Sequence, residues 1–323
     1  MSNPCYQSIV HRTALATTCL ALLPIIVGAL VTSMGAGMAF ADWPSSDGEF
    51  MLTYPWFSDL IIGAKDKFVE HGHRLAGMLI GLASIALVAV LFRKEPRVWV
   101  KMLGLAVLLC VIAQGILGGM RVLANRADFA MFHGNFAALV FTLMASVSLV
   151  TSRQWYRVSE SNRFPELGVL KPLAFLTTAA IYGQYILGGR QRHLHDMLHE
   201  HLGAAFAVFL LVVVTSVFAH RSKEPWLKRS AWTMFFLVLT QATLGLGAWV
   251  TKFGFPPTGY VAVQDSTLQL FVRSSHTVVG MLLLMSSVMF ILRLLRIDAR
   301  RQEHRSTAGH SLASPVSLEG GAG

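Results

Sequence analysis

Long apolar stretches alternate with short polar segments along nearly the whole chain. A helix needs about 20 consecutive apolar residues to cross the hydrocarbon layer of a membrane. Stretches of this kind occupy residues 13–34, 69–92, 102–120, 130–151, 172–189, 197–219, 231–249 and 272–292. The pattern therefore predicts an all-α membrane protein with eight transmembrane helices.

Composition supports the same class. Of 323 residues, 54% are hydrophobic and 14% are charged, whereas a soluble domain carries about 25% charged residues. This argues against a soluble enzyme and against a disordered chain. The net charge of +10 suggests nucleic acid at first sight, but basic residues beside apolar spans more often record membrane topology. We expect a lipid bilayer as a partner, and no nucleic acid.

The distribution of lysine and arginine predicts the orientation. Two thirds of the 27 basic residues fall on the side of the membrane that holds the N-terminus, if all eight spans cross. Cytoplasmic segments carry this excess. Residues 13–34 are too long for the apolar region of a signal peptide, so we predict a retained helix. We expect residues 1–12 and a disordered tail, 294–323, in the cytoplasm.

An internal repeat divides the chain into two halves. Residues 114–118 (Gln-Gly-Ile-Leu-Gly) resemble 241–245, and a third copy occupies 184–188. The repeat predicts two tandem, pseudo-symmetric four-helix bundles, 13–151 and 172–293, joined by a cytoplasmic linker, 152–171. The glycines either allow close helix packing or make room for a flat ligand.

Four histidines recur at equivalent places, each a few residues after an even-numbered span begins. They are His73, His133, His201 and His276. Even-numbered spans begin on the outer side, so all four are expected at one depth, with one pair in each half. Two imidazoles on facing helices can hold a haem iron from both sides. Zinc is less attractive, because neither half supplies three or four clustered ligands.

A carboxylate distinguishes the first half from the second. Glu70 precedes His73 by three residues, so both project from nearly the same helix face. Glu70 is a candidate proton acceptor or cation stabiliser; the alternative is an interfacial ion pair with Arg74 or Lys67. Because Leu198 holds the equivalent position in the second half, we expect one reactive site and one holding site.

A histidine-rich stretch precedes the third ligand. His201 is preferred to His199 as the ligand because the repeat places it opposite His73. A surface metal site and a solvated interfacial loop both remain open for the other histidines of the stretch, which include His193 and His195. Outer-side arginines either neutralise haem propionates or anchor the interface; they are Arg74, Arg190 and Arg192.

Several motifs together resemble the haem A synthase family over about residues 13–293. Residues 28–44 end in Asp-Trp-Pro, like the family's first-helix signature, and residues 70–74 match its Glu-x-x-His-Arg pattern. The matches continue at 132–134 (Phe-His-Gly) and at 275–276 (Ser-His). A departure is that residues 35–68 contain no cysteine, so a thiol–disulfide mechanism in that loop is not available.

The resemblance implies a function and a role for each half. The family oxidises a methyl group of haem O to a formyl group, giving haem A for terminal oxidases. His73 and His133 would hold haem O or haem A, with Glu70 as the catalytic carboxylate and Arg74 at the same site. His201 and His276 would hold a resident haem b. The expected setting is a bacterial cell membrane, with haem O synthase, an electron acceptor and a second copy of the chain as candidate partners.

Two other functions, an electron-carrying cytochrome and a transporter, fit part of the same pattern. A two-haem cytochrome b that only carries electrons would lack a role for Glu70 and for the unlike halves. A transporter built from repeats would place its polar residues near the bilayer midplane rather than near one surface. The pigment of the purified protein separates the three, since a transporter is colourless and only the synthase yields a formyl-bearing haem.

Overall fold

The computed structural model describes residues 6–157, 167–222 and 224–312, with side chains up to residue 302. Within this part the chain is helical and forms no strand. Its α-helices are α1 (Ser8–Leu20), α2 (Leu22–Ser33), α3 (Trp56–Ile61), α4 (Lys65–Lys94), α5 (Val98–Ala124), α6 (Ala127–Thr151), α7 (Arg153–Tyr156), α8 (Leu167–His193), α9 (Leu198–Arg221), α10 (Pro225–Phe253) and α11 (Thr267–Leu312). A 3₁₀ turn, η1 (Pro256–Thr258), lies between α10 and α11.

Seven stretches of the described chain are long and apolar enough to cross a membrane. They are α1 with α2, then α4, α5, α6, α9, α10 and α11 as far as Gln302. The chain is thus a multi-span helical membrane protein. The remaining expected span, 172–189, corresponds to α8, which is as long as the others but less apolar. Some of its polar side chains bond to other helices, as Thr177 does to Thr215 of α9 at 2.7 Å.

The first expected span is interrupted at Ala21, which separates α1 from α2. Pro24 explains the break, because its ring nitrogen cannot donate to the carbonyl of Leu20 one turn earlier. The next bond along, from Ile25 N to Ala21 O, is long at 3.4 Å. The span therefore continues across the bend as a kinked helix.

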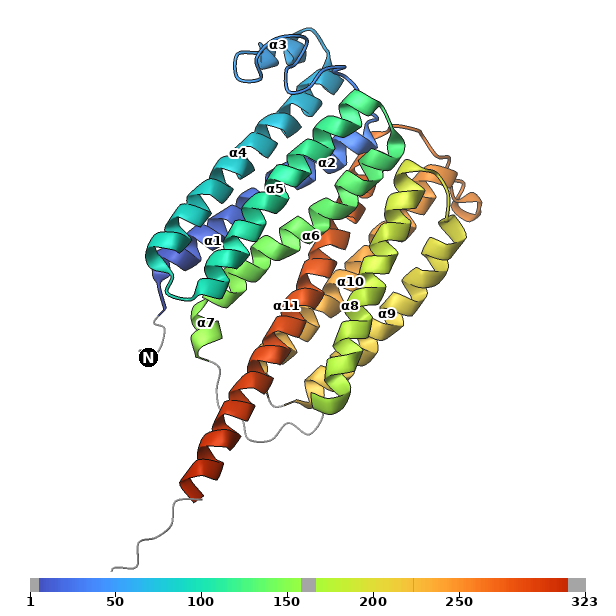
Figure 1. The fold of residues 1–323 in the computed structure, drawn as a ribbon. Coiled ribbons are helices and arrows are strands. Elements are labelled where there is room, and N and C mark those ends of the chain that lie inside the picture. Colours follow the sequence, from blue (N-terminus) through green and yellow to red (C-terminus); the bar gives the residue numbers. More distant parts are fainter. Residues whose placement is uncertain (1–5, 158–166, 223, 313–323) are drawn as a thin grey trace, which may run out of the picture.

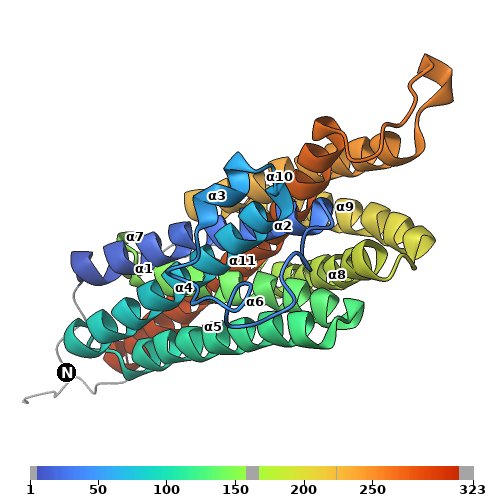
Figure 2. The same cartoon turned by 90° about the horizontal axis from the view of Figure 1, so that it is seen from above.

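The long helices pack in two sets that share a boundary (Figures 1 and 2). In the first set, α4 packs against α1, α2 and α5, and α6 packs against α1 and α5. In the second, α8, α9, α10 and α11 pack in a ring, each against the next. Apolar side chains form a separate core in each set. The sets meet where α11 contacts α2 and α6, and where α6 contacts α8.

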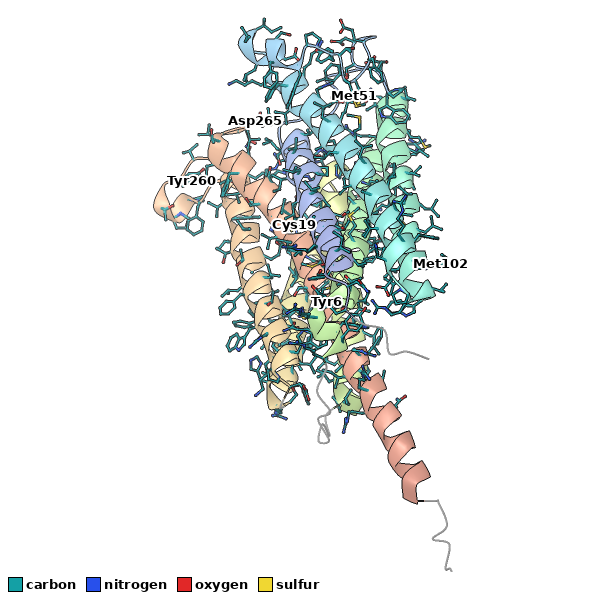
Figure 3. All side chains as sticks on the ribbon, turned by 90° about the vertical axis from the view of Figure 1, so that its left-hand side faces the viewer. Tyr6, Cys19, Met51, Met102, Tyr260 and Asp265 are labelled. Atoms are coloured by element: carbon teal, nitrogen blue, oxygen red, sulfur yellow. The ribbon has the colours of Figure 1, made fainter. Side chains whose placement is uncertain are left out.

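The connections 34–64 and 254–266 lie at one end of the helices. Figure 3 shows Met51 and Asp265, from these two segments, at that end, and Tyr6 towards the other. The short connections after α5 and α8 lie at the same end (Figure 1). Helices α4, α6, α9 and α11 therefore all begin there, which is the end where the four histidines were expected.

The C-terminal region differs from the disordered tail expected from residue 294. Helix α11 continues to Leu312, and Leu294 and Ile297 are buried. Asp298 forms an ion pair with Lys171 of α8. The arginines, glutamine and glutamate that follow are good helix formers, so the helix extends beyond its apolar part. Residues 1–5 of the expected N-terminal segment, 158–166 of the linker and 313–323 of the tail lie outside the described residues.

Candidate functional site

The four expected histidines form two pairs. His73 of α4 faces His133 of α6, with 6.2 Å between ring centroids and 82° between ring planes. His201 of α9 faces His276 of α11, with 6.3 Å and 83°. Each pair lies within one helix set, near the end where its helices begin. The repeat read from the sequence therefore corresponds to two nearly identical arrangements of imidazoles.

The separation within each pair fits a metal ion bound between the rings. An imidazole nitrogen binds a metal at about 2.0 Å, and the centre of a ring with bonds of about 1.33 Å lies about 1.1 Å from each atom. Two imidazoles on opposite sides of one ion would thus have centroids about 6 Å apart, as both pairs do. Among the described residues, no group of three or more His, Cys, Asp or Glu is placed to hold a metal. Two opposed imidazoles with four open positions suit an iron whose other ligands come from a porphyrin.

A glycine lies against the ring of every one of these histidines. A Cβ added at Gly118, Gly188 or Gly245 would lie 3.1 Å from Cε1 of the nearest of these histidines. At Gly28 it would lie only 2.7 Å from Cε1 of His73. The repeated glycines were expected to serve helix packing or a flat ligand, and the structure shows a third role, which is room for the imidazole itself. Gly28 is a fourth copy that the sequence pattern missed, because Pro24 stands where the other copies have glutamine.

Glutamines of the repeat hold three of the four histidines. Gln114 Nε2 donates to the main-chain carbonyl of His133 at 2.9 Å and lies 3.2 Å from its Nδ1. Gln184 does the same for His201, at 2.9 Å and 3.1 Å. Gln241 Nε2 lies 3.4 Å from Nε2 of His276. His73 has Pro24 in the corresponding place and therefore no such amide.

Glu70 is buried at the first pair and fully engaged. It is 3% exposed, and its Oε1 accepts a hydrogen bond from Arg74 at 2.8 Å. Its Oε2 accepts from the main-chain nitrogens of Ala39 at 2.7 Å and Phe40 at 3.4 Å. The ion pair with Arg74, which was the alternative to a catalytic role, is therefore present. A negative charge is nevertheless fixed one helical turn from His73.

Arg74 also holds the connection between α2 and α4. Its Nη1 donates to the carbonyls of Asp42 at 3.0 Å and Ser45 at 2.6 Å. The Asp-Trp-Pro motif thus has a structural role here, since the carbonyl of its aspartate accepts a hydrogen bond from Arg74. The ring of Trp43 lies against Gly119 of α5, next to the glycine that faces His133.

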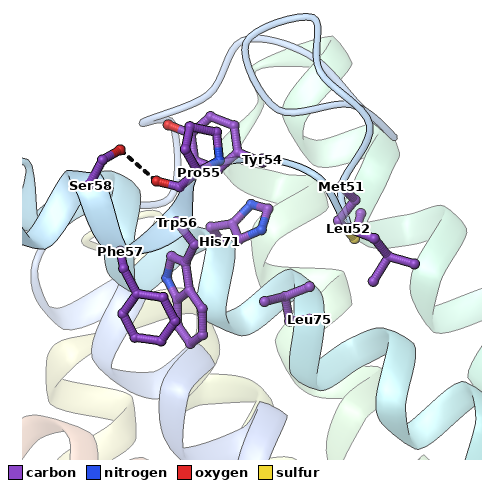
Figure 4. Close-up of a pocket in the computed structure, with 9 residues that line it drawn as sticks. All are labelled: Met51, Leu52, Tyr54, Pro55, Trp56, Phe57, Ser58, His71 and Leu75. Atoms are coloured by element: carbon purple, nitrogen blue, oxygen red, sulfur yellow. Dashed lines mark hydrogen bonds between the residues drawn. The ribbon is translucent and has the colours of Figure 1, made fainter.

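His71 anchors the same segment from the other face of α4, although no sequence pattern singled it out. It is 1% exposed, and its Nδ1 lies 3.1 Å from Ser46 Oγ. Tyr54 and Trp56 pack around its ring beside a pocket of about 460 Å³ (Figure 4). Burial, together with the hydrogen bond to Asp59, raises the pKa of Tyr54 above its usual range. The segment 34–64 is therefore packed onto the first site rather than extended into solvent.

The outer-side arginines have different partners. Arg190 pairs with Asp196 at 2.5 Å. Arg192 points between the two helix sets and bonds only neutral oxygens. Arg121, which the sequence did not single out, bonds the carbonyl of Gly37, and its charge acts on both histidines of the first pair.

The histidine-rich stretch does not gather into a metal site within the described chain. His193 lies at the end of α8, 3.7 Å from the position a Cβ would take on Gly134, beside the first pair. His195 and His199 are exposed. The preference for His201 over His199 agrees with the pairing geometry.

Together, the fold and the site define a class: multi-span helical membrane proteins with two opposed pairs of intramembrane histidines. A family model described as cytochrome oxidase assembly protein matches residues 59–200, somewhat less than half of the chain. Over this stretch the chain is similar to that family, as its motifs suggested.

Several proteins that the chain is similar to are described alike, as haem A synthases. The chain is 34% identical over 144 residues to a haem A synthase of Symbiobacterium thermophilum, covering 43% of this chain and 44% of that protein. It is 30% identical over 131 residues to one of Paracoccus denitrificans, covering 39% and 34%. It is 25% identical over 333 residues to one of Geobacillus kaustophilus, covering 95% and 98%. The aligned part thus spans less than half the length of the first two relatives and nearly all of the third.

Proposed function

We propose that this protein is a haem A synthase, a membrane-bound oxidoreductase that converts the methyl group of haem O to the formyl group of haem A for terminal oxidases. The observation that carries the proposal is the combination of two iron-sized histidine pairs with a buried carboxylate at only one of them. The match to the family model over residues 59–200 and the description of the relatives support it.

In this proposal each half of the chain has one task. His73 and His133 hold haem O as substrate and haem A as product, and His201 and His276 hold a resident haem b. The porphyrin iron supplies the redox chemistry, and the protein positions and tunes it. The helices fix the imidazoles, the glycines admit them, and the segment 34–64 limits the access of water to the first pair.

Glu70 is the proposed catalytic carboxylate. Arg74 and the two main-chain amides hold its carboxylate in one position, beside the place proposed for the reacting group. Such a charge, oriented before the reaction, stabilises positive charge that develops in a transition state. Leu198 supplies nothing comparable at the second pair, which fits a site that only retains its haem.

The membrane arrangement completes the proposal. Helix α8 also crosses the membrane, which brings the number of spans to eight. The two helix sets are tandem four-helix bundles, 13–151 and 172–293. Both termini and the segment 152–171 lie in the cytoplasm of a bacterial cell, as the basic residues indicate. Haem O synthase, an electron acceptor and a second copy of the chain are the partners we propose.

The near-identical geometry of the two pairs favours one other candidate, a two-haem cytochrome b. Co-expression with a source of haem O in a cell that lacks haem A separates the two functions. Extraction of the pigment should yield a haem with a formyl-shifted spectrum. Unaltered haem O together with haem b would contradict the synthase and support the cytochrome. A colourless preparation would contradict both.

A further inference from the structure

Arg192 lies where the two helix sets meet. From α8, its Nη1 donates to Thr277 Oγ1 at 2.7 Å and to the carbonyl of Arg273 at 3.3 Å, both on α11. Its Nη2 donates to the carbonyl of Ala29 at 2.7 Å and to Ser33 Oγ at 2.9 Å, both on α2. Four hydrogen bonds thus join three helices, and every acceptor is neutral.

The positive charge of Arg192 has no carboxylate to balance it among the described residues. The neighbouring Arg190 pairs with Asp196, and Arg74 pairs with Glu70. An arginine side chain stays protonated in proteins. A charge between helices, away from bulk water, is weakly screened and acts strongly on nearby groups.

On the α11 side, Arg192 lies next to the second histidine pair. Thr277, which it bonds, directly follows His276, and the charge of Arg192 acts on that histidine. The first pair has two cations nearby, Arg121 and Arg74, and Arg74 is paired with Glu70. The two pairs thus have the same geometry and a different charge environment.

We propose that Arg192 raises the reduction potential of the iron held by His201 and His276. The inference rests on the proposed function in one respect, namely that this pair holds a haem. Reduction lowers the charge of the iron centre by one, so a fixed positive charge nearby stabilises the reduced state.

Two variants of Arg192 separate its charge from its hydrogen bonds. Arg192→Gln removes the charge, whereas Arg192→Lys keeps it but cannot form all four bonds. A reductive titration of the haem-loaded protein, followed by its absorption spectrum, measures the potential. In a His133→Ala background the first pair lacks a ligand, so the potential of the second haem is measured alone. We expect a lower potential in Arg192→Gln and a nearly unchanged one in Arg192→Lys, with Arg190→Gln as the unchanged control.

A second pair of variants neutralises the charge while Arg192 stays in place. Ser33→Asp puts a carboxylate at an atom that Arg192 already bonds, and Ser33→Asn is its neutral control. We expect Ser33→Asp to lower the potential and Ser33→Asn to leave it unchanged, so the test survives if Arg192→Gln fails to fold. Equal shifts in Arg192→Lys and Arg192→Gln, or no shift in Ser33→Asp, would overturn the inference.

The result does not depend on haem A formation. A protein that binds haem at the second pair but makes no haem A would refute the proposed function. The reduction potential of that haem could still be measured in the variants. A protein that makes haem A without any shift in the charge variants would refute the inference alone.

Discussion

The two histidine pairs have nearly the same geometry and different surroundings. Ring separation and ring angle agree within 0.1 Å and 1°, as expected for a repeat. The first pair, however, has Glu70, a long packed segment and a proline in place of one glutamine. The second pair has Leu198, a short connection and two glutamine amides. The repeat preserved the positions of the iron ligands and diverged in the groups that determine what happens at the iron.

This difference has a physical meaning. The partner of the second ring nitrogen fixes the orientation of a histidine ligand, and such partners typically contribute 10- to 100-fold in metal affinity. His201 and His276 both have an amide partner, so the second pair is suited to keep its haem. His73 lacks one and lies beside a charged carboxylate, so the first pair is suited to exchange and to chemistry.

The largest expected effect comes from removing a ligand of the second pair. His276→Ala leaves His201 without an opposing imidazole, so we expect the resident haem to be lost and the haem-to-protein ratio of the purified protein to fall by about half. His199→Ala is the control, because that side chain is exposed and outside both pairs. An unchanged ratio in His276→Ala would show that the pair holds no haem.

Glu70 tests the asymmetry directly. Glu70→Ala should abolish haem A formation and retain haem b, since only the first pair uses the carboxylate. Leu198→Ala, at the equivalent position of the second half, should leave haem A formation intact. Pigment extraction measures both products. Haem A at the wild-type level in Glu70→Ala would remove the proposed catalytic role.

The glycines that contact the histidine rings allow a test in which the size of the steric clash is varied. Gly28→Ala puts a Cβ 2.7 Å from the ring of His73, and Gly188→Ala puts one 3.1 Å from that of His201. We expect Gly28→Ala to weaken haem binding at the first pair by up to about 100-fold and Gly188→Ala to have a smaller effect at the second. Gly183→Ala in α8 meets nothing within 4 Å, so haem titration should give the wild-type affinity. Equal losses in Gly183→Ala and Gly188→Ala would mean that the contact with the ring is irrelevant.

The smallest expected effect concerns the glutamine amides. Gln184→Leu removes the donor to the main-chain carbonyl of His201, and we expect about 10-fold weaker haem binding at the second pair. The first pair should not respond, because no described contact joins Gln184 to it. Measuring the rate of haem transfer to apomyoglobin would reveal the change. A rate equal to that of the wild type would contradict the retaining role assigned to the amides.

The sequence predicted those features that depend on local pattern. Hydropathy marked the apolar helices. The repeat selected four histidines that the structure brings together in two pairs, with His201 rather than His199 facing His276. Helix α8 is less apolar than the other spans, and some of its polar residues, such as Thr177, bond to other helices. The length of α11 exceeded the expectation because helix-forming polar residues follow the apolar part.

Contacts between distant segments could not be read in this way. The sequence pattern did not show that Gly28 is equivalent to the glycines of the repeat, because Pro24 stands where the other copies have glutamine. The bonds of Arg192 to α2 and α11 join residues more than 80 positions apart in sequence. His71 lies in the quoted Glu-x-x-His-Arg motif, but only the packed segment 34–64 shows that it anchors Ser46.

Low-temperature electron paramagnetic resonance of the oxidised, haem-loaded protein tests most directly whether each histidine pair grips an iron from both sides. We predict two low-spin ferric haems per chain, one signal disappearing in His73→Ala and the other in His201→Ala. A single signal, or two signals that persist in both variants, would contradict the account.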